Sequence, residues 1–220
     1  MEDTAASSNA PTGTPDEHDQ HHHVEEVSVV AQALRQKYDN GCRTLEDNHL
    51  DQAIEQELQG APWLSPFLPS SPEAMSVFVT FSGLSSEDVI LDIGCGDGRV
   101  LVTMAKAFGC RGIGIDVSRA CIDAAEAIGR AEGVPGGLLS WHCADATRPR
   151  IFDELGLAAA TVVFLYAYPT LLAQLKELLE RLRARGVRVL TLQYHIMWTG
   201  WEPCQSCEEP VSMRSYSPIR

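Results

Sequence analysis

From residue 88 onward, short apolar runs alternate with longer segments in which apolar residues recur every three or four positions. The first pattern predicts buried strands and the second predicts amphipathic helices. The predicted strands are 89–93, 112–115, 138–143, 161–165 and 187–192. The predicted helices are 98–108, 119–132 and 171–183, the last with a leucine stripe typical of a helix packed on a sheet. This alternation indicates βαβ units, so we expect an α/β fold: a Rossmann-like, doubly wound, mostly parallel sheet with helices on both faces.

The first 84 residues have a different character. Residues 1–23 are rich in Ser, Thr, Pro and Asp, which predicts a disordered acidic tail. Over 24–58 apolar residues recur at helical spacing, which predicts one or two amphipathic helices with a break near Asn40 and Gly41. Four prolines within 61–72 predict an extended segment. A helix over 72–83, capped by Ser71, is expected to follow.

The chain has a formal net charge of −13, and its first 60 residues hold 13 of the 30 acidic side chains but only three of the 17 basic ones. The acidity therefore belongs to the N-terminal arm. Neither part has the basic excess of a surface that neutralises phosphates, so we expect no nucleic acid partner. No run approaches the roughly 18 apolar residues of a membrane span, so we expect no membrane association. Seven cysteines without a signal-peptide pattern predict a reduced protein of the cytoplasm, with the nucleus as the alternative.

The segment 91–99, Leu-Asp-Ile-Gly-Cys-Gly-Asp-Gly-Arg, joins the first predicted strand to the first predicted helix. This junction of a parallel sheet is where nucleotides bind, and glycines let the backbone approach a ligand. A dinucleotide site would need a third glycine where Arg99 stands, and the Gly-Lys-Ser/Thr of a phosphate-binding loop is missing. Asp97 would also repel a pyrophosphate. An acidic, glycine-rich loop instead favours a cationic or zwitterionic ligand.

Three acidic residues stand at the ends of successive predicted strands: Asp92, Asp116 and Asp145. A carboxylate at the position of Asp116 can accept both hydroxyls of an adenosine ribose, and Asp145 could accept from the adenine amino group. Because these strand ends share one edge of the sheet, the acids and the loop predict a site for S-adenosylmethionine. The expected cofactor-binding residues are Asp92, Gly94, Cys95, Gly96, Gly98, Asp116, Val117, Asp145 and Ala146.

Residues 85–194 resemble the class I (seven-stranded) S-adenosylmethionine-dependent methyltransferases, whose signature is carried here by residues 92–98. The segments 66–71, 92–100, 165–169 and 201–203 are similar to the lysine methyltransferases that modify the ATP synthase c-subunit and the adenine nucleotide translocase, and to their bacterial relatives. This resemblance implies N-methylation of a protein lysine. The implied organisation is a tail over 1–23, a helical arm with a cofactor-lid segment over 24–84, and a methyltransferase domain over 85–220.

The resemblance also suggests substrate-side residues. It implies that Phe67, Pro69, Tyr166 and Pro169 are substrate or lid residues. Phe67 and Pro69 could form a lid over the cofactor or simply cover the sheet edge, and Tyr166 could wall the lysine channel or simply pack at the strand end. The ring of Tyr166 could attract a cation. Methylases of adenine N6 or of glutamine carry Asp or Asn after the fourth strand, and 165–169 has neither. A neutral amine needs no general base, so no catalytic residue is assigned.

Several features depart from that family. Cys95 stands where the family usually has Ser, Tyr168 is expected only to pack, and no apolar tether precedes the domain. Only 17 residues of this sequence follow Pro203, which predicts little room for a final antiparallel hairpin. Cys204 and Cys207 form a single C-x-x-C pair, so free thiols rather than a metal site are expected.

Two other functions remain open from the sequence. The chain could methylate a small molecule or a different protein atom, or it could be a catalytically silent interaction protein that uses its acidic arm. The intact loop glycines, Asp116 and Asp145 favour an enzyme. The sequence leaves the oligomeric state undetermined.

Overall fold

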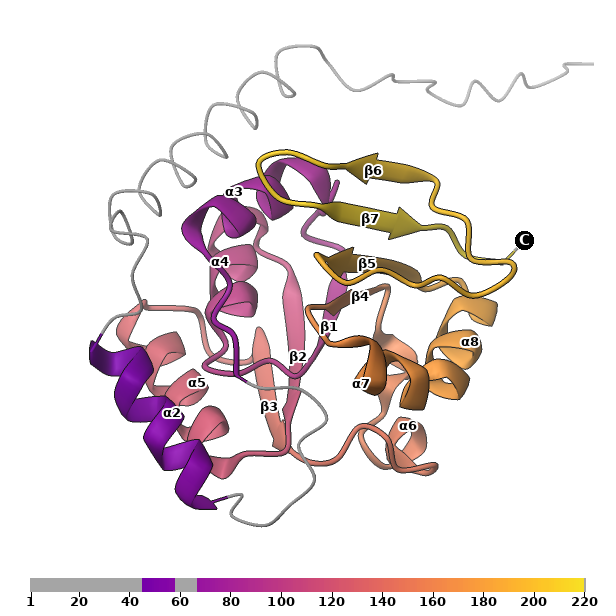
Figure 1. Ribbon diagram of the computed structural model, residues 1–220. Helices are drawn as coiled ribbons and strands as arrows, with labels where there is room; N and C mark the ends of the chain where they lie inside the picture. The colour runs from indigo at the N-terminus through magenta and orange to yellow at the C-terminus, as the bar shows by residue number, and fades with distance from the viewer. Residues whose placement is uncertain (1–44, 58–66, 220) are drawn as a thin grey trace, which may run out of the picture.

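The computed structural model describes residues 45–57 and 67–219. The strands within these residues are β1 (Val89–Ile93), β2 (Arg111–Asp116), β3 (Leu139–Cys143), β4 (Val162–Leu165), β5 (Arg188–Leu192), β6 (Gln205–Cys207) and β7 (Met213–Tyr216). They form one seven-stranded sheet in the order β3-β2-β1-β4-β5-β7-β6 (Figure 1). Neighbours among β1–β5 are parallel, whereas β7 is antiparallel to β5 and to β6. The predicted α/β fold is confirmed, with the five predicted strands displaced by no more than one residue at either end.

Helices cover both faces of the sheet (Figure 1). The helices are α2 (Leu45–Glu57), α3 (Pro72–Phe81), α4 (Arg99–Phe108), α5 (Arg119–Ala131), α6 (Ile151–Glu154), α7 (Pro169–Gln174) and α8 (Lys176–Ala184), with a short 3-10 helix, η1 (Leu157–Ala159). All five residues of β1 are buried. Ile90 packs with α3 and α4, whereas Leu91 and Ile93 pack with α6–α8. Burial on both faces explains why the parallel strands read as continuous apolar runs.

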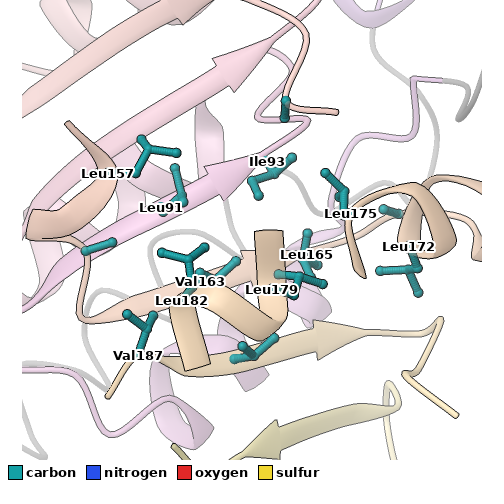
Figure 2. Close-up of a cluster of buried hydrophobic side chains, with 14 of the residues drawn as sticks. Leu91, Ile93, Leu157, Val163, Leu165, Leu172, Leu175, Leu179, Leu182 and Val187 are labelled. Atoms are coloured by element: carbon teal, nitrogen blue, oxygen red, sulfur yellow. The ribbon is translucent and has the colours of Figure 1, made fainter. Parts of the chain in front are cut away.

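The leucine stripe of the C-terminal helices packs on the sheet, as predicted (Figure 2). Leu175, Leu179 and Leu182 are fully buried against a cluster that contains Val163 and Leu165 of β4. Full burial of a leucine side chain contributes about 1.5–3 kcal/mol, so this stripe stabilises the whole α7–α8 layer.

The single helix predicted over 171–183 is two helices. α7 begins earlier, with Pro169 as its first residue, and Leu175 separates it from α8. Leu175 has φ −82° and ψ −2°, and this ψ departs from that of a regular α-helix at one residue. Its amide still donates to the carbonyl of Leu171, and its carbonyl accepts from Leu179. The helical periodicity therefore continues across the break, which is why the sequence pattern did not reveal it.

The expectation that the chain has little room for a C-terminal hairpin is wrong. β6 and β7 need only three and four residues, and β7 pairs with β5 from Val189–Tyr216 to Leu192–Met213. Met213 and Tyr216 have no exposed surface, so the hairpin closes the core beside β5. Cys207 lies in β6 and Cys204 just before β6, and both are free thiols.

Part of the N-terminal arm belongs to the described structure. α2 lies along α5 (Figure 1), and α3 begins where Ser71 accepts a hydrogen bond from the amide of Ala74 at 3.1 Å. The predicted cap and helix of α3 are thus confirmed. The tail over 1–23 and the break near Asn40 and Gly41 lie outside the described residues. Among the helices that are described, none has the length and apolar character needed to cross a bilayer.

Candidate active site

A cavity of about 560 Å³ lies at the carboxyl ends of β1, β2, β3 and β4. The order of strands reverses between β1 and β4, and such a reversal point is where open parallel sheets bind ligands. Most of the site residues expected from the sequence line this cavity: Phe67, Pro69, Asp92, Gly94, Cys95, Gly96, Asp116, Val117, Asp145, Ala146 and Tyr166. Gly98 and Pro169 do not line it.

The glycine loop after β1 forms one side of the cavity. The amides of Gly94 and Cys95 both donate to the carbonyl of Ile115 in β2, at 2.8 and 3.1 Å. Gly94 has φ +79°, and a Cβ built on it would meet no atom within 4 Å. The positive φ requires glycine, and the open space above it leaves the backbone accessible to a ligand.

Asp116, the last residue of β2, holds this loop. Its Oδ2 accepts a hydrogen bond of 2.9 Å from the amide of Gly96, and its Oδ1 accepts one of 3.0 Å from the amide of Ser118. A carboxylate offers about four acceptor positions, so the fixed Asp116 can accept further donors from a ligand. Burial raises the pKa of Asp116.

Asp92 is the most deeply buried acid of the site, with 3% of its surface exposed. Burial, together with repulsion from Asp116 and Asp97, raises its pKa to about 8. Asp97 itself forms an ion pair with Arg99, whose Nε lies 2.9 Å from Oδ1. Because Asp92 is protonated at neutral pH and Asp97 is paired with Arg99, Asp116 and Asp145 are the lining carboxyl groups that remain to attract a cationic ligand.

Gly98 has a packing role that the sequence did not reveal. It is the N-cap of α4 with φ +75°. A Cβ on it would lie 2.4 Å from the ring of Trp141 and 2.8 Å from Ala125. Gly98 therefore allows the start of α4 to approach β3 and α5. It lies outside the cavity lining, and its contact with the cofactor stays a prediction.

Asp145 lies on the exposed rim of the cavity, where the chain leaves β3. Its Oδ1 accepts hydrogen bonds from the amide of Thr147 at 2.8 Å and from its hydroxyl at 2.6 Å. These bonds fix the orientation of the carboxylate, while buried Ala146 forms the adjacent wall.

The ring of Phe67 covers the glycine loop. A Cβ on Gly96 would lie 2.7 Å from Cε2 of this ring. Only glycine at 96 therefore lets the ring of Phe67 approach the loop this closely. Phe67 and Pro69 both line the cavity, and their role as a lid stays a prediction.

Tyr166 stands at the end of β4, on the opposite side. Its hydroxyl donates to Oε1 of Gln193 at 2.7 Å, and its ring stacks near Tyr194 with centroids 6.2 Å apart. Tyr168 stacks on Tyr194 at 4.5 Å, so its predicted packing role is observed. Pro169 begins α7 and does not face the cavity. Sequence reasoning missed Tyr194 because it becomes a neighbour of Tyr166 only through the β4–β5 pairing.

Several residues that line the cavity were also missed. Ile54 of α2 and Ser118 at the start of α5 line the cavity, as do Leu171 and Gln174 of α7. Ser118 carries a visible signal, because a Ser two residues after Asp116 and before a helical pattern is a typical N-cap. The position of Ile54 depends on how α2 docks, for which the sequence holds no local signal.

Comparisons with known proteins agree with this geometry. The methyltransferase domain family matches residues 90–186. A protein-lysine N-methyltransferase from Saccharolobus islandicus (strain REY15A) is 29% identical over 139 residues, which cover 63% of this chain and 81% of that protein.

Solved structures share the fold. An RNA methyltransferase from Salinibacter ruber, in complex with S-adenosyl-L-homocysteine, has a TM-score of 0.59 at 22% identity and covers 70% of this chain and 95% of its own. A putative rRNA methylase from Clostridium thermocellum has a TM-score of 0.51 at 13% identity, covering 70% and 99%. The glycine loop, the fixed carboxylate of Asp116 and the acid-lined cavity fit a positively charged adenosyl cofactor. Together with the family match and the methyltransferase relative, they identify residues 90–186 as a class I S-adenosylmethionine-dependent methyltransferase domain.

Proposed function

We propose that this enzyme transfers methyl groups from S-adenosylmethionine to a lysine side chain of a protein. The observation that carries the proposal is the relative named a protein-lysine N-methyltransferase, which aligns over 81% of its own length. Features of the site support the proposal independently of that name.

The first feature is the set of groups that would hold the cofactor. Asp116 would accept from the ribose hydroxyls and Asp145 from the adenine amino group, while the open backbone at Gly94 would contact the ligand. When bound, S-adenosylmethionine supplies an electrophilic methyl group on a sulfonium sulfur. The task of the protein is then to orient the acceptor and to exclude water.

The second feature is how the site would treat a lysine amine. The amine must be neutral to act as a nucleophile, and a desolvated position favours the neutral form. Phe67, Pro69 and Tyr166 would supply such a position, because each presents apolar surface to the cavity. A methylated product would keep its positive charge, which the ring face of Tyr166 attracts.

The third feature is that the segment at the end of β4 lacks an acceptor for an amide nitrogen. Residues 165–169, which begin at the last residue of β4, carry no Asp or Asn side chain that could accept from an amide or an adenine N6 amino group. The hydroxyl of Tyr166 is directed to Gln193 instead. This composition favours an amine over an amide as acceptor.

The RNA methyltransferase structures support the fold only, because their identity to this chain is 22% or lower. The net charge of −13 disfavours a polyanionic substrate. We therefore propose a protein substrate rather than RNA. The free buried thiols of Cys95, Cys110 and Cys121 support a reducing compartment, and we propose the cytoplasm or nucleus.

The test is a methylation assay with isotopically labelled S-adenosylmethionine and three acceptors: a lysine-rich protein extract, the same extract with acetylated lysines, and total RNA. Label recovered as methyl-lysine, and lost upon acetylation, is the expected result. At a cofactor concentration below saturation, Asp116→Ala should strongly reduce the signal, whereas Asp123→Ala, at an exposed position of α5, serves as the matched control. Label on RNA, arginine, histidine or a small molecule would overturn the lysine assignment. Cofactor binding with no acceptor labelled would favour the silent interaction protein.

A further inference from the structure

The C-terminal residue of α2 is bound to the start of α5, more than 60 residues later in the chain. Oε2 of Glu57 accepts hydrogen bonds from the hydroxyl of Ser118 at 2.7 Å and from the amide of Ala120 at 3.2 Å. Its Oε1 accepts one from the amide of Arg119 at 2.8 Å. Three donors therefore converge on one carboxylate.

These bonds complete the capping of α5. The first amides of a helix lack partners within the helix, and α5 begins at Arg119. Ser118, the N-cap, accepts only from the amide of Cys121 at 3.2 Å. Glu57 supplies the acceptors for Arg119 and Ala120, and its negative charge also suits a helix N-terminus.

The same carboxylate lies beside the cofactor cavity. Ser118, to which Glu57 binds, lines the cavity together with Asp116. Ile54, one helical turn before Glu57 in α2, lines the cavity as well and is only 3% exposed. One face of α2 thus provides both a wall of the cavity and the attachment of that wall to α5.

Hydrogen bonding keeps the carboxylate of Glu57 ionised. Burial tends to raise the pKa of Glu57, but the hydrogen bonds from Ser118, Arg119 and Ala120 lower it below its ordinary value. The side chain is therefore an ionised acceptor at neutral pH, and hydrogen bonds to a charged group are the stronger kind.

We propose that α2 is a cofactor-retaining element of this methyltransferase, in which Ile54 covers the cavity and Glu57 is a positioning residue that latches α2 to the start of α5. The inference rests on the cofactor and not on the lysine substrate. By linkage, docked α2 and bound cofactor stabilise each other: cofactor binding must favour docking by the same factor by which docking strengthens binding.

The test compares Glu57→Gln with Glu55→Gln, which makes the same chemical change at an exposed position of the same helix. Glu57→Gln should bind S-adenosylhomocysteine about fivefold more weakly, the change expected from loss of one helix cap, and mainly through faster dissociation. Glu55→Gln should match the parent protein. Titration calorimetry gives affinity and stoichiometry, and a stopped-flow chase gives the dissociation rate.

Two further measurements separate a latch from a general loss of stability. Ile54→Ala leaves the cap intact and should also speed dissociation of S-adenosylhomocysteine. Hydrogen exchange of the α2 amides should slow when S-adenosylhomocysteine binds to the parent, and slow less in Glu57→Gln. The proposal is overturned if Glu57→Gln and Glu55→Gln release the ligand at the same rate, or if the ligand leaves exchange in α2 of the parent unchanged.

Discussion

The amide of Gly96 donates a hydrogen bond of 2.9 Å to Oδ2 of Asp116, so the carboxylate that ends β2 holds the glycine loop that follows β1. The other oxygen of the same carboxylate accepts from the amide of Ser118. The two cofactor signals of the sequence, the loop and the strand-end acid, are therefore one structural unit.

Asp116→Ala should weaken binding of S-adenosylmethionine and S-adenosylhomocysteine by about 10- to 100-fold. The substitution leaves the amides of Gly96 and Ser118 without their acceptor, and a buried polar group without a partner costs about 1–3 kcal/mol. Calorimetric titration with both ligands measures the effect. Asp123→Ala is the control, and an affinity for Asp116→Ala within about twofold of the parent would contradict this role.

The stability of the ligand-free protein should depend on pH through Asp92. Its pKa is about 8 in the folded protein against 3.8 for the free side chain. Between these values the folded state retains a proton that the unfolded state has released, so this group makes stability fall as pH rises through that window. Asp92→Asn removes the titration.

The free energy of unfolding of Asp92→Asn should therefore rise relative to the parent between about pH 5.5 and about pH 8, by about 3 kcal/mol. Urea unfolding at both pH values measures this difference, and other titrating groups cancel in the comparison. Asp123→Asn should show no such change. A constant difference between Asp92→Asn and the parent would mean that Asp92 is ionised throughout.

Gly98→Ala should destabilise the protein by about 2–4 kcal/mol, because the methyl group meets Trp141 and Ala125 and the residue must keep a positive φ. Gly133→Ala isolates the second effect: Gly133 has φ +68° but no atom within 4 Å of the added carbon. It should cost about 1 kcal/mol. Equal denaturation midpoints for the two variants would refute the close approach at Gly98.

Two substitutions of Tyr166 distinguish the contribution of its ring from that of its hydroxyl in the proposed substrate channel. Tyr166→Phe removes the bond to Gln193 but keeps the aromatic face, whereas Tyr166→Ala removes both. For a lysine acceptor, we expect Tyr166→Ala to raise KM about five- to tenfold and Tyr166→Phe to stay near the parent. Steady-state kinetics with one peptide that the enzyme methylates measures the KM of both variants and of the parent. An equal loss in both variants would assign the effect to the hydroxyl instead.

The sequence predicted the sheet well because its parallel strands are buried on both faces and its helices carry one apolar stripe. β1 and the stripe through Leu179 and Leu182 are examples. The prediction failed at Leu175, because the spacing of apolar residues continues unchanged across the interruption between α7 and α8. It also failed at β6 and β7, since strands of three and four residues carry too little pattern to be detected.

For the site, the sequence by itself determined the chemistry that is local to the chain: the glycine loop around Gly94 and Gly96, and the acids that end consecutive strands. These signals are readable because backbone conformation and strand ends depend on neighbouring residues. The tertiary structure was needed to show that Gly98 packs on Trp141 and that Tyr194 joins Tyr166. It was also needed to show that Ile54 of α2 lines the cavity and that Glu57 binds Ser118. Those contacts join residues far apart in the chain, and docking of helices and pairing of strands brings them together only when the core forms.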